Sequence, residues 1–157
     1  IEAPPGRAVD YGFVARKIGE LISDFDVVGL AYDRWRIEIL LQRLSEAGID
    51  CFVDEKDAGS SNALRLIPWG QGFKDMGPAI DALEISVLER RFKHDGNPVL
   101  TDNFASAAVV TDPAGNRKLN KSATRFRIDG AVAVAMAIGC KVARAEVPAP
   151  SYQMFFA

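Results

Sequence analysis

Hydrophobic residues recur every three or four positions in several parts of the chain, which is the spacing that lines one face of a helix. This pattern predicts helices over residues 10–24, 34–47, 77–92 and 128–144. Gly48 follows the second of these helices, and Pro78 is expected in the first turn of the third, where proline is tolerated. The last helix is rich in alanine and valine, as expected for a helix that lies flat against a sheet.

Shorter apolar runs between the helices predict strands, which cover residues 27–32, 49–53 and 67–69. Residues 109–111 and 117–120 flank the turn-rich sequence DPAGN, which favours a hairpin. Residues 100–108 fit a helix or a strand equally well, and the polar stretch at 54–62 is predicted to be a loop. The alternation of helices and strands is typical of an α/β fold.

The composition is that of one ordinary globular domain, with 157 residues of which 48% are hydrophobic and 25% charged. The formal net charge of −2 provides no bulk attraction to nucleic acid, so a contact with DNA would need local basic clusters. Such clusters occur at Arg90, Arg91 and Lys93, at Arg117, Lys118 and Lys121, and at Arg125 and Arg127. Solvated surface positions explain them equally well.

Cys51 and Cys140 lie far apart in apolar surroundings, and the chain has a single histidine, His94. This argues against a structural zinc site, and sparse cysteine is typical of a reducing compartment, although the two cysteines are able to pair in principle. No signal-peptide pattern is present, and the longest apolar stretch, at 131–138, is too short to span a bilayer. We therefore expect a soluble intracellular protein that makes no membrane contact.

The common catalytic signatures are missing from the sequence. It contains no GxxxxGKS/T phosphate loop, no GxSxG elbow, no HExxH helix and no GxGxxG after a strand. The usual ATPase, serine hydrolase, metalloprotease and dinucleotide-binding sites are therefore excluded. His94 lies in a polar loop, where a lone histidine is more often a turn element than a catalyst.

Two aspartates stand where elements end or begin. Asp33 closes the apolar run at 27–32, and Asp129 opens the last helix. A carboxylate after a buried strand lies at the sheet edge where α/β folds collect ligands, and the last helix would bring Asp129 to the same edge. Two carboxylates with only oxygen chemistry around them suit Mg²⁺ or Mn²⁺ and indicate metal-assisted phosphodiester hydrolysis. The alternative is that each aspartate only caps the helix that follows it.

The order of several features is more specific than any one of them. In chain order they are Tyr32-Asp33 with Trp35 two residues on, Ala47-Gly48, Gln71-Gly72, His94-Asp95-Gly96-Asn97-Pro98-Val99-Leu100, Asn103, the DPAGN turn, Lys121, and Arg127-Ile128-Asp129-Gly130 before an alanine-rich helix. Over residues 10–138 this order resembles the C-terminal nuclease domain of the large terminase subunit of tailed bacteriophages.

The resemblance implies a ribonuclease H-like fold, in which helices flank a mixed sheet. It also implies an endonuclease that cuts concatemeric double-stranded viral DNA in the cytoplasm of the bacterial host, with two Mg²⁺ or Mn²⁺ ions. On the family pattern Asp33 and Asp129 are catalytic metal ligands, and the residues near DNA are His94, Arg117, Lys118 and Lys121. The implied partners are an upstream ATPase domain of the same polypeptide, the small terminase subunit and the portal.

One part of the family pattern is missing. The family's first metal-binding aspartate lies on an initial strand, whereas Glu2 is the only acidic residue at positions 1–9. We therefore expect a nuclease domain over residues 1–147 that lacks its first strand or strands, followed by a tail at 148–157. Because it lacks one carboxylate ligand, such a fragment would be weakly active or inactive. The alternatives are a structural or DNA-docking fragment without catalysis, and another ribonuclease H-like nuclease such as a junction resolvase.

Overall fold

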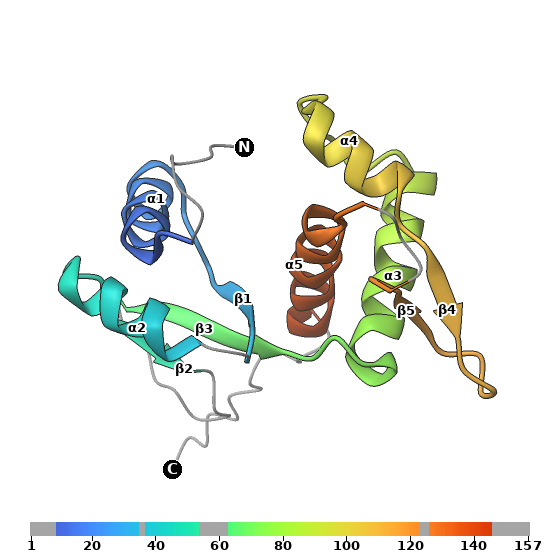
Figure 1. The fold of residues 1–157 in the computed structure, drawn as a ribbon, viewed down its shortest axis with the longest axis horizontal. Coiled ribbons are helices and arrows are strands. Elements are labelled where there is room, and N and C mark those ends of the chain that lie inside the picture. The colour runs from blue at the N-terminus through green and yellow to red at the C-terminus, as the bar shows by residue number, and fades with distance from the viewer. Residues whose placement is uncertain (1–8, 35–36, 54–62, 123–125, 146–157) are drawn as a thin grey trace, which may run out of the picture.

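The computed structural model describes residues 9–34, 37–53, 63–122 and 126–145. The helices are α1 (Tyr11–Asp24), α2 (Ile37–Glu46), α3 (Phe73–Leu88), α4 (Pro98–Ala105) and α5 (Asp129–Ala145), and the strands are β1 (Leu30–Asp33), β2 (Cys51–Val53), β3 (Leu64–Trp69), β4 (Val109–Thr111) and β5 (Arg117–Leu119) (Figure 1). The prediction of an α/β fold is confirmed. The predicted loop at 54–62 and the predicted tail at 148–157 lie outside the described residues.

The sheet is parallel and has the strand order β1-β3-β2, while β4 and β5 form a separate antiparallel pair. Leu64 and Leu66 of β3 are buried on one face, and the alternation of side chains along a strand directs the residues between them to the other face. Pro68 lies in the middle strand, where proline is normally excluded. It is tolerated because β2 pairs only with residues 64–66, so that β3 has β1 as its neighbour at Pro68.

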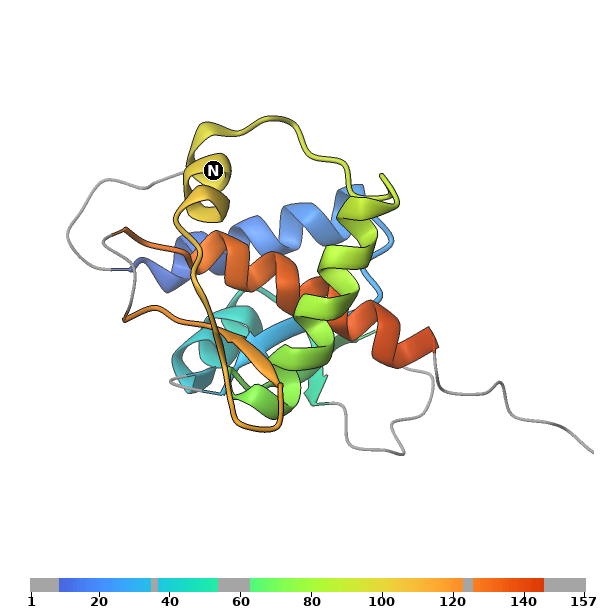
Figure 2. The ribbon, with the colours of Figure 1, turned by 90° about the vertical axis from the view of Figure 1, so that its right-hand side faces the viewer.

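The helices gather in two groups at opposite sides of the molecule (Figure 1). In one group α1 packs against α2, which contacts β2; in the other, α5 packs against α3, α4 and β1. Figure 2 shows α3 crossing in front of α5. The main core lies between these two helices and consists of Met76, Ile80, Ile128, Val132, Ala135 and Met136, with Ala31 and Trp69 packed against it. Through this core, α5 packs against Ala31 of β1 and Trp69 of β3.

Small residues let α3 approach its neighbours closely. A Cβ atom added to Gly139 of α5 would lie 2.7 Å from the Ala79 Cβ and 2.7 Å from Trp69 Cζ2. On another side of α3, a Cβ atom added to Gly77 would lie 3.6 Å from the carbonyl oxygen of Arg117 in β5, which is an ordinary van der Waals distance, so the close approach to α3 is confined to Gly139. The small residues of α5 thus serve its contact with α3 as well as its contact with the sheet.

The patterns located α1, α2 and α5, but several boundaries were wrong, among them the start of β3, which begins at Leu64 rather than at residue 67. Helix α3 begins at Phe73 rather than at residue 77, so Pro78 lies inside the helix and not in its first turn. Strand β1 begins at Leu30 rather than at residue 27, and Asp33 is its last residue. The ambiguous segment at 100–108 falls mainly in α4, which starts at Pro98 because the Asn97 side chain accepts hydrogen bonds from the Val99 and Leu100 amides.

The hairpin of β4 and β5 is confirmed. Its turn is closed by Asp112, whose carboxylate accepts hydrogen bonds from the Ala114 and Asn116 amides and from the Asn116 side chain. Gly115 has φ of 86°, which glycine adopts without strain. The hydrogen bond from the Asn116 side chain is the main reason why the pKa of Asp112 lies below its usual value. The hairpin is fastened to α3 by Arg117, whose guanidinium pairs with Asp81 and lies 2.7 Å from Glu84 Oε2.

Among the described residues, none of the helices combines the length and the apolar character that crossing a membrane requires.

Candidate active site

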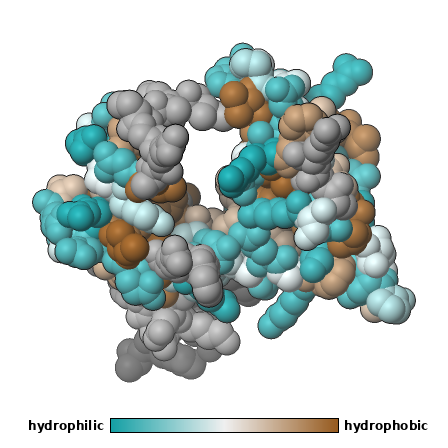
Figure 3. Space-filling model, in the orientation of Figure 1, coloured by the Kyte–Doolittle hydropathy of each residue, from teal (hydrophilic) through white to brown (hydrophobic). Residues whose placement is uncertain are grey.

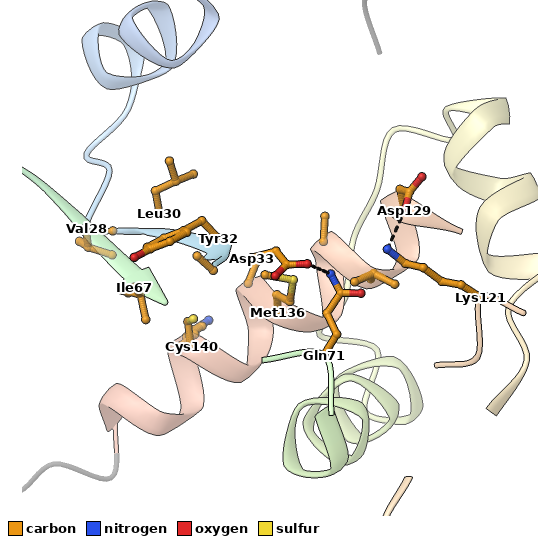
Figure 4. A pocket seen from close by; sticks show the side chains of 16 residues that line it. Val28, Leu30, Tyr32, Asp33, Ile67, Gln71, Lys121, Asp129, Met136 and Cys140 are labelled. Atoms are coloured by element: carbon orange, nitrogen blue, oxygen red, sulfur yellow. Dashed lines mark hydrogen bonds and ion pairs between the residues drawn. The ribbon is translucent and has the colours of Figure 1, made fainter. Parts of the chain in front are cut away.

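A cavity of about 520 Å³ lies between β1 and α5. These elements border the hollow that separates the two helix groups in Figure 3. Figure 4 shows Asp33 and Gln71 between Cys140 on one side and the pair of Lys121 and Asp129 on the other. The remaining lining is mostly apolar and includes Val28, Leu30, Ala31, Ile67, Val132 and Met136. The candidate chemistry is thus confined to a few polar groups on an apolar wall.

Asp33 reaches this cavity from the end of β1. Ala31 packs against the core that contains α5, and Asp33 lies two residues later on the same strand, so its side chain points to the same face of the sheet. Gln71 Nε2 donates a hydrogen bond to Asp33 Oδ2 at 2.5 Å. The register pairs Asp33 with Trp69, and this brings Gln71, which follows the end of β3, close to the carboxylate.

Asp129 reaches the cavity from the first turn of α5. Lys121 Nζ lies 3.0 Å from Asp129 Oδ1, and Arg127 Nη1 lies 3.8 Å from Oδ2. The Asp129 side chain is 59% exposed, so these ion pairs contribute little to stability. Their main effect is local, because they place two cationic groups beside the carboxylate that sequence reasoning assigned to a metal.

The start of α5 is held by α4. The Gly130 amide donates a hydrogen bond of 2.7 Å to Asn103 Oδ1, and Asn103 Nδ2 donates one of 2.8 Å to the Val99 carbonyl. Asn103 is only 8% exposed, so both bonds are shielded from water. Asn103 therefore satisfies a helix-terminal amide next to Asp129, which is the task expected of a cap.

Gln71 and Asn103 belong to the ordered pattern of the sequence, but that pattern assigns a role to neither of them. A signal was present for Asn103, because a polar side chain on the apolar side of a short helix needs a buried partner. No local signal marks Gln71, since its partner lies 38 positions away.

The donor set suits a hard cation better than a soft one. Asp33 and Asp129 supply carboxylate oxygens, and Gln71 adds an amide group. Burial raises the pKa of Cys140, which also lines the cavity, to about 11, so that its sulfur is protonated at neutral pH. Both cysteines are free thiols. Within the described ranges, no group of three or more acidic, histidine or cysteine side chains is arranged to hold a metal, so the protein ligands of a cation here would be few.

The other predicted site residues lie outside the lining of this cavity. His94 stacks on Phe92 with ring centroids 5.9 Å apart, and its Nδ1 accepts a hydrogen bond from the Gly96 amide. Lys118 Nζ lies 4.7 Å from the centre of the Phe73 ring, and Arg117 is engaged with the acidic residues of α3. Lys121 alone among the predicted DNA contacts belongs to the cavity wall described here. Trp35 and Arg125 lie outside the described residues.

Comparison with known proteins shows the family to which the sequence is similar. The sequence profile of the terminase large subunit, endonuclease domain, matches residues 2–146. The large terminase subunit of Enterobacteria phage HK97 is 45% identical over 139 residues, which are 88% of this chain and 25% of that protein. Protein YmfN of Escherichia coli K12 is 34% identical over 71 residues, which are 44% of this chain and 16% of that protein.

A solved structure extends the similarity to three dimensions. The crystal structure of the HK97 large terminase superposes with a TM-score of 0.73 over 87% of this chain and 26% of that one. The chain thus spans about a quarter of the length of the phage protein that it matches.

Proposed function

The chain belongs to the family of terminase large subunit endonuclease domains, and from this premise we propose that it is a divalent-metal-dependent endonuclease acting on double-stranded viral DNA. One observation carries the proposal beyond the family. Asp33 and Asp129 are far apart in the sequence, yet both line one cavity between β1 and α5 (Figure 4). If the two aspartates only capped helices, nothing would require their carboxylates to line the same cavity.

Asp33 and Asp129 would hold Mg²⁺ or Mn²⁺ through their carboxylate oxygens. When bound, a pair of such ions activates the attacking water and stabilises the leaving oxygen of the phosphodiester. The chain's own residues orient these ligands: Gln71 holds Asp33, and Asn103 fixes the helix start that carries Asp129. Because the described residues bring two carboxylates to the cavity, we expect weak binding of metal and slow cutting by this chain.

We propose that the DNA backbone approaches the cavity from the side of Lys121. Its ammonium lies at the cavity wall, and cationic side chains that neutralise phosphates provide the sequence-independent part of DNA affinity. We propose that Lys118, which is half-buried on β5, and His94, which is exposed in the loop before α4, also contribute to DNA binding. For Arg117 we propose an indirect role, because its pairs with Asp81 and Glu84 hold the hairpin against α3.

The polypeptide that contains this domain is proposed to work in DNA packaging. By its family, the endonuclease would cut concatemeric DNA in the host cytoplasm together with an ATPase domain of the same polypeptide, a small terminase subunit and a portal. The chain spans a quarter of the phage HK97 subunit, so these partners concern the longer protein.

The test follows Mn²⁺ by two-dimensional NMR of the ¹⁵N-labelled chain and follows nicking of supercoiled plasmid with Mn²⁺. We expect paramagnetic broadening to concentrate on residues around Asp33 and Gly130, and nicking to stop when EDTA is added. The double variant Asp33→Asn/Asp129→Asn should lose both effects. Asp102→Asn, which alters an exposed aspartate of α4 outside the cavity, serves as the matched control and should keep them.

Three outcomes would count against the proposal. Broadening centred away from the cavity would refute the metal site. Nicking that survives in the double variant would refute the catalytic role of the aspartates. Cutting confined to four-way junctions, with intact duplex left uncut, would instead indicate a junction resolvase.

A further inference from the structure

We propose that Gln71 is a positioning residue of the metal site: its side-chain amide holds Oδ2 of Asp33 and so fixes how this carboxylate is presented to a cation. This inference rests on the proposed function, because it concerns how that site is prepared for metal. It assigns a task to a residue that contacts a candidate ligand rather than the substrate.

The contact itself is direct. Gln71 Nε2 lies 2.5 Å from Asp33 Oδ2, and both residues line the cavity (Figure 4). The bond joins the end of β1 to the connection after β3, across 38 positions of sequence. An amide that engages Oδ2 restricts rotation of the carboxylate, so Oδ1 keeps a defined direction.

The backbone that carries Gln71 is short and supported at both ends. Gln71 lies between Trp69, the last residue of β3, and Phe73, the first residue of α3. At the helix side, the Gly72 carbonyl accepts a hydrogen bond of 3.0 Å from the Met76 amide. At the strand side, a Cβ atom on Gly70 would lie 2.1 Å from Asp75 Oδ2, so the Asp75 carboxylate closely covers this part of the connection. A side chain on such a connection is positioned more precisely than one on a long loop.

The type of donor also matters. A primary amide is neutral, so it stabilises the Asp33 carboxylate without cancelling the charge that attracts a cation. A lysine or arginine in the same place would compete with the metal. Hydrogen-bond partners of metal ligands commonly contribute about 10- to 100-fold to metal affinity. We expect the lower end of this range, because the bond between Gln71 and Asp33 is exposed.

The experiment compares two substitutions of the same kind. Gln71→Met keeps the length of the side chain and removes its donor. Gln42→Met is the matched control, because Gln42 Nε2 also donates to a carboxylate, that of Glu46, at 2.9 Å on α2 and outside the cavity. The dissociation constant for Mn²⁺ is measured on the whole chain by water-proton relaxation, and thermal unfolding is recorded for each variant.

We expect Gln71→Met to bind Mn²⁺ about tenfold more weakly than the wild type, whereas Gln42→Met binds it equally well. Both variants should unfold within a few degrees of the wild type. Wild-type affinity in Gln71→Met, together with lost affinity in Asp33→Asn, would overturn the inference and leave the proposed function standing. Absence of Mn²⁺ binding at the cavity of the wild-type chain would overturn the proposed function, and the inference with it.

Discussion

Asp33 and Asp129 line the same cavity, but their surroundings differ in charge and in origin. Asp33 ends a strand, and its carboxylate accepts a hydrogen bond from the neutral amide of Gln71. Asp129 begins a helix, and its carboxylate faces the cationic groups of Lys121 and Arg127. The cation proposed for this site would therefore meet a carboxylate held by a neutral amide on one side and an ion-paired carboxylate on the other.

The difference teaches that the two halves of the site respond to different perturbations. The sheet register and the hydrogen bond from Gln71 hold the Asp33 carboxylate in place, so loss of the Gln71 amide should weaken the proposed metal binding. A metal bound at Asp129 would have to displace Lys121, so loss of this lysine should strengthen the proposed metal binding. Opposite effects of two neighbouring substitutions would be hard to obtain from a general loss of structure.

The largest effect is expected from replacing the carboxylates themselves, and here Asp33 and Asp129 should behave alike. Asp33→Asn and Asp129→Asn should each lower the rate of Mn²⁺-dependent plasmid cleavage by about 100-fold or more, because each removes a charged ligand. Urea denaturation should show little change for either variant, since both side chains are exposed. A variant that keeps wild-type cleavage while losing stability would show that its aspartate is structural.

The next largest effect is expected from Asn103, and it should be felt at Asp129 but not at Asp33. Asn103→Ala leaves the Gly130 amide and the Val99 carbonyl without their buried partner, so we expect a loss of about 1–3 kcal/mol in the free energy of unfolding. Asn103→Asp keeps an acceptor at the helix start and should lose less. In NMR spectra the amides of Asp129 and Gly130 should shift, whereas Asp33 and Gln71 should not. Equal shifts of the Asp33 and Asp129 amide signals would contradict the view that Asn103 acts only on the Asp129 side of the cavity.

A smaller effect tests the competition at Asp129. Lys121→Met should tighten Mn²⁺ binding by about fivefold, because an exposed ion pair contributes up to about 1 kcal/mol. Lys141→Met is the control: it makes the same change of charge in the same cavity, but roughly 18 Å along α5 from Asp129. Equal tightening in both variants, measured by water-proton relaxation, would indicate a general charge effect instead of displacement.

The smallest effect concerns the apolar part of the wall. Burial raises the pKa of Cys140 to about 11, against about 8.5 in an unfolded chain. Below pH ~8.5 the thiol is protonated in both states, and between pH ~8.5 and 11 the unfolded chain releases its proton first, so the folded state loses stability as pH rises. Urea denaturation at pH 7 and pH 10 should show this loss. Cys140→Ala should show a smaller dependence on pH, and an equal dependence would contradict the assignment to this thiol.

Local sequence signals predicted the elements whose boundaries depend on local contacts. Asp10 caps α1 by accepting a hydrogen bond from the Phe13 amide, and Gly48 adopts φ of 73° just after α2. The DPAGN turn closes through its own aspartate, as its composition indicated. In each case the interacting groups lie within a few residues of each other, so a pattern of residue types was sufficient.

The elements that were misjudged depend on distant contacts. Pro78 suggested a later start for α3, but this helix packs along α5 and β5, and those distant contacts favour its earlier start at Phe73. Likewise the six-residue strand β3 contains Arg65 and Pro68, which no strand pattern favours, because its length is set by pairing with β1 on one side and β2 on the other.

The sequence by itself identified Asp33 and Asp129 as candidates, because each is an acidic residue at the terminus of an element, and it indicated an α/β nuclease through the order of short motifs. Only the tertiary structure decided which groups surround them. Strand order β1-β3-β2 brings Gln71 to Asp33, and the packing of α5 against α3, α4 and β1 brings Asn103 to Gly130 and Asp129 to the cavity. Such contacts join residues tens of positions apart, and they form only because burying the shared core fixes the elements that carry them.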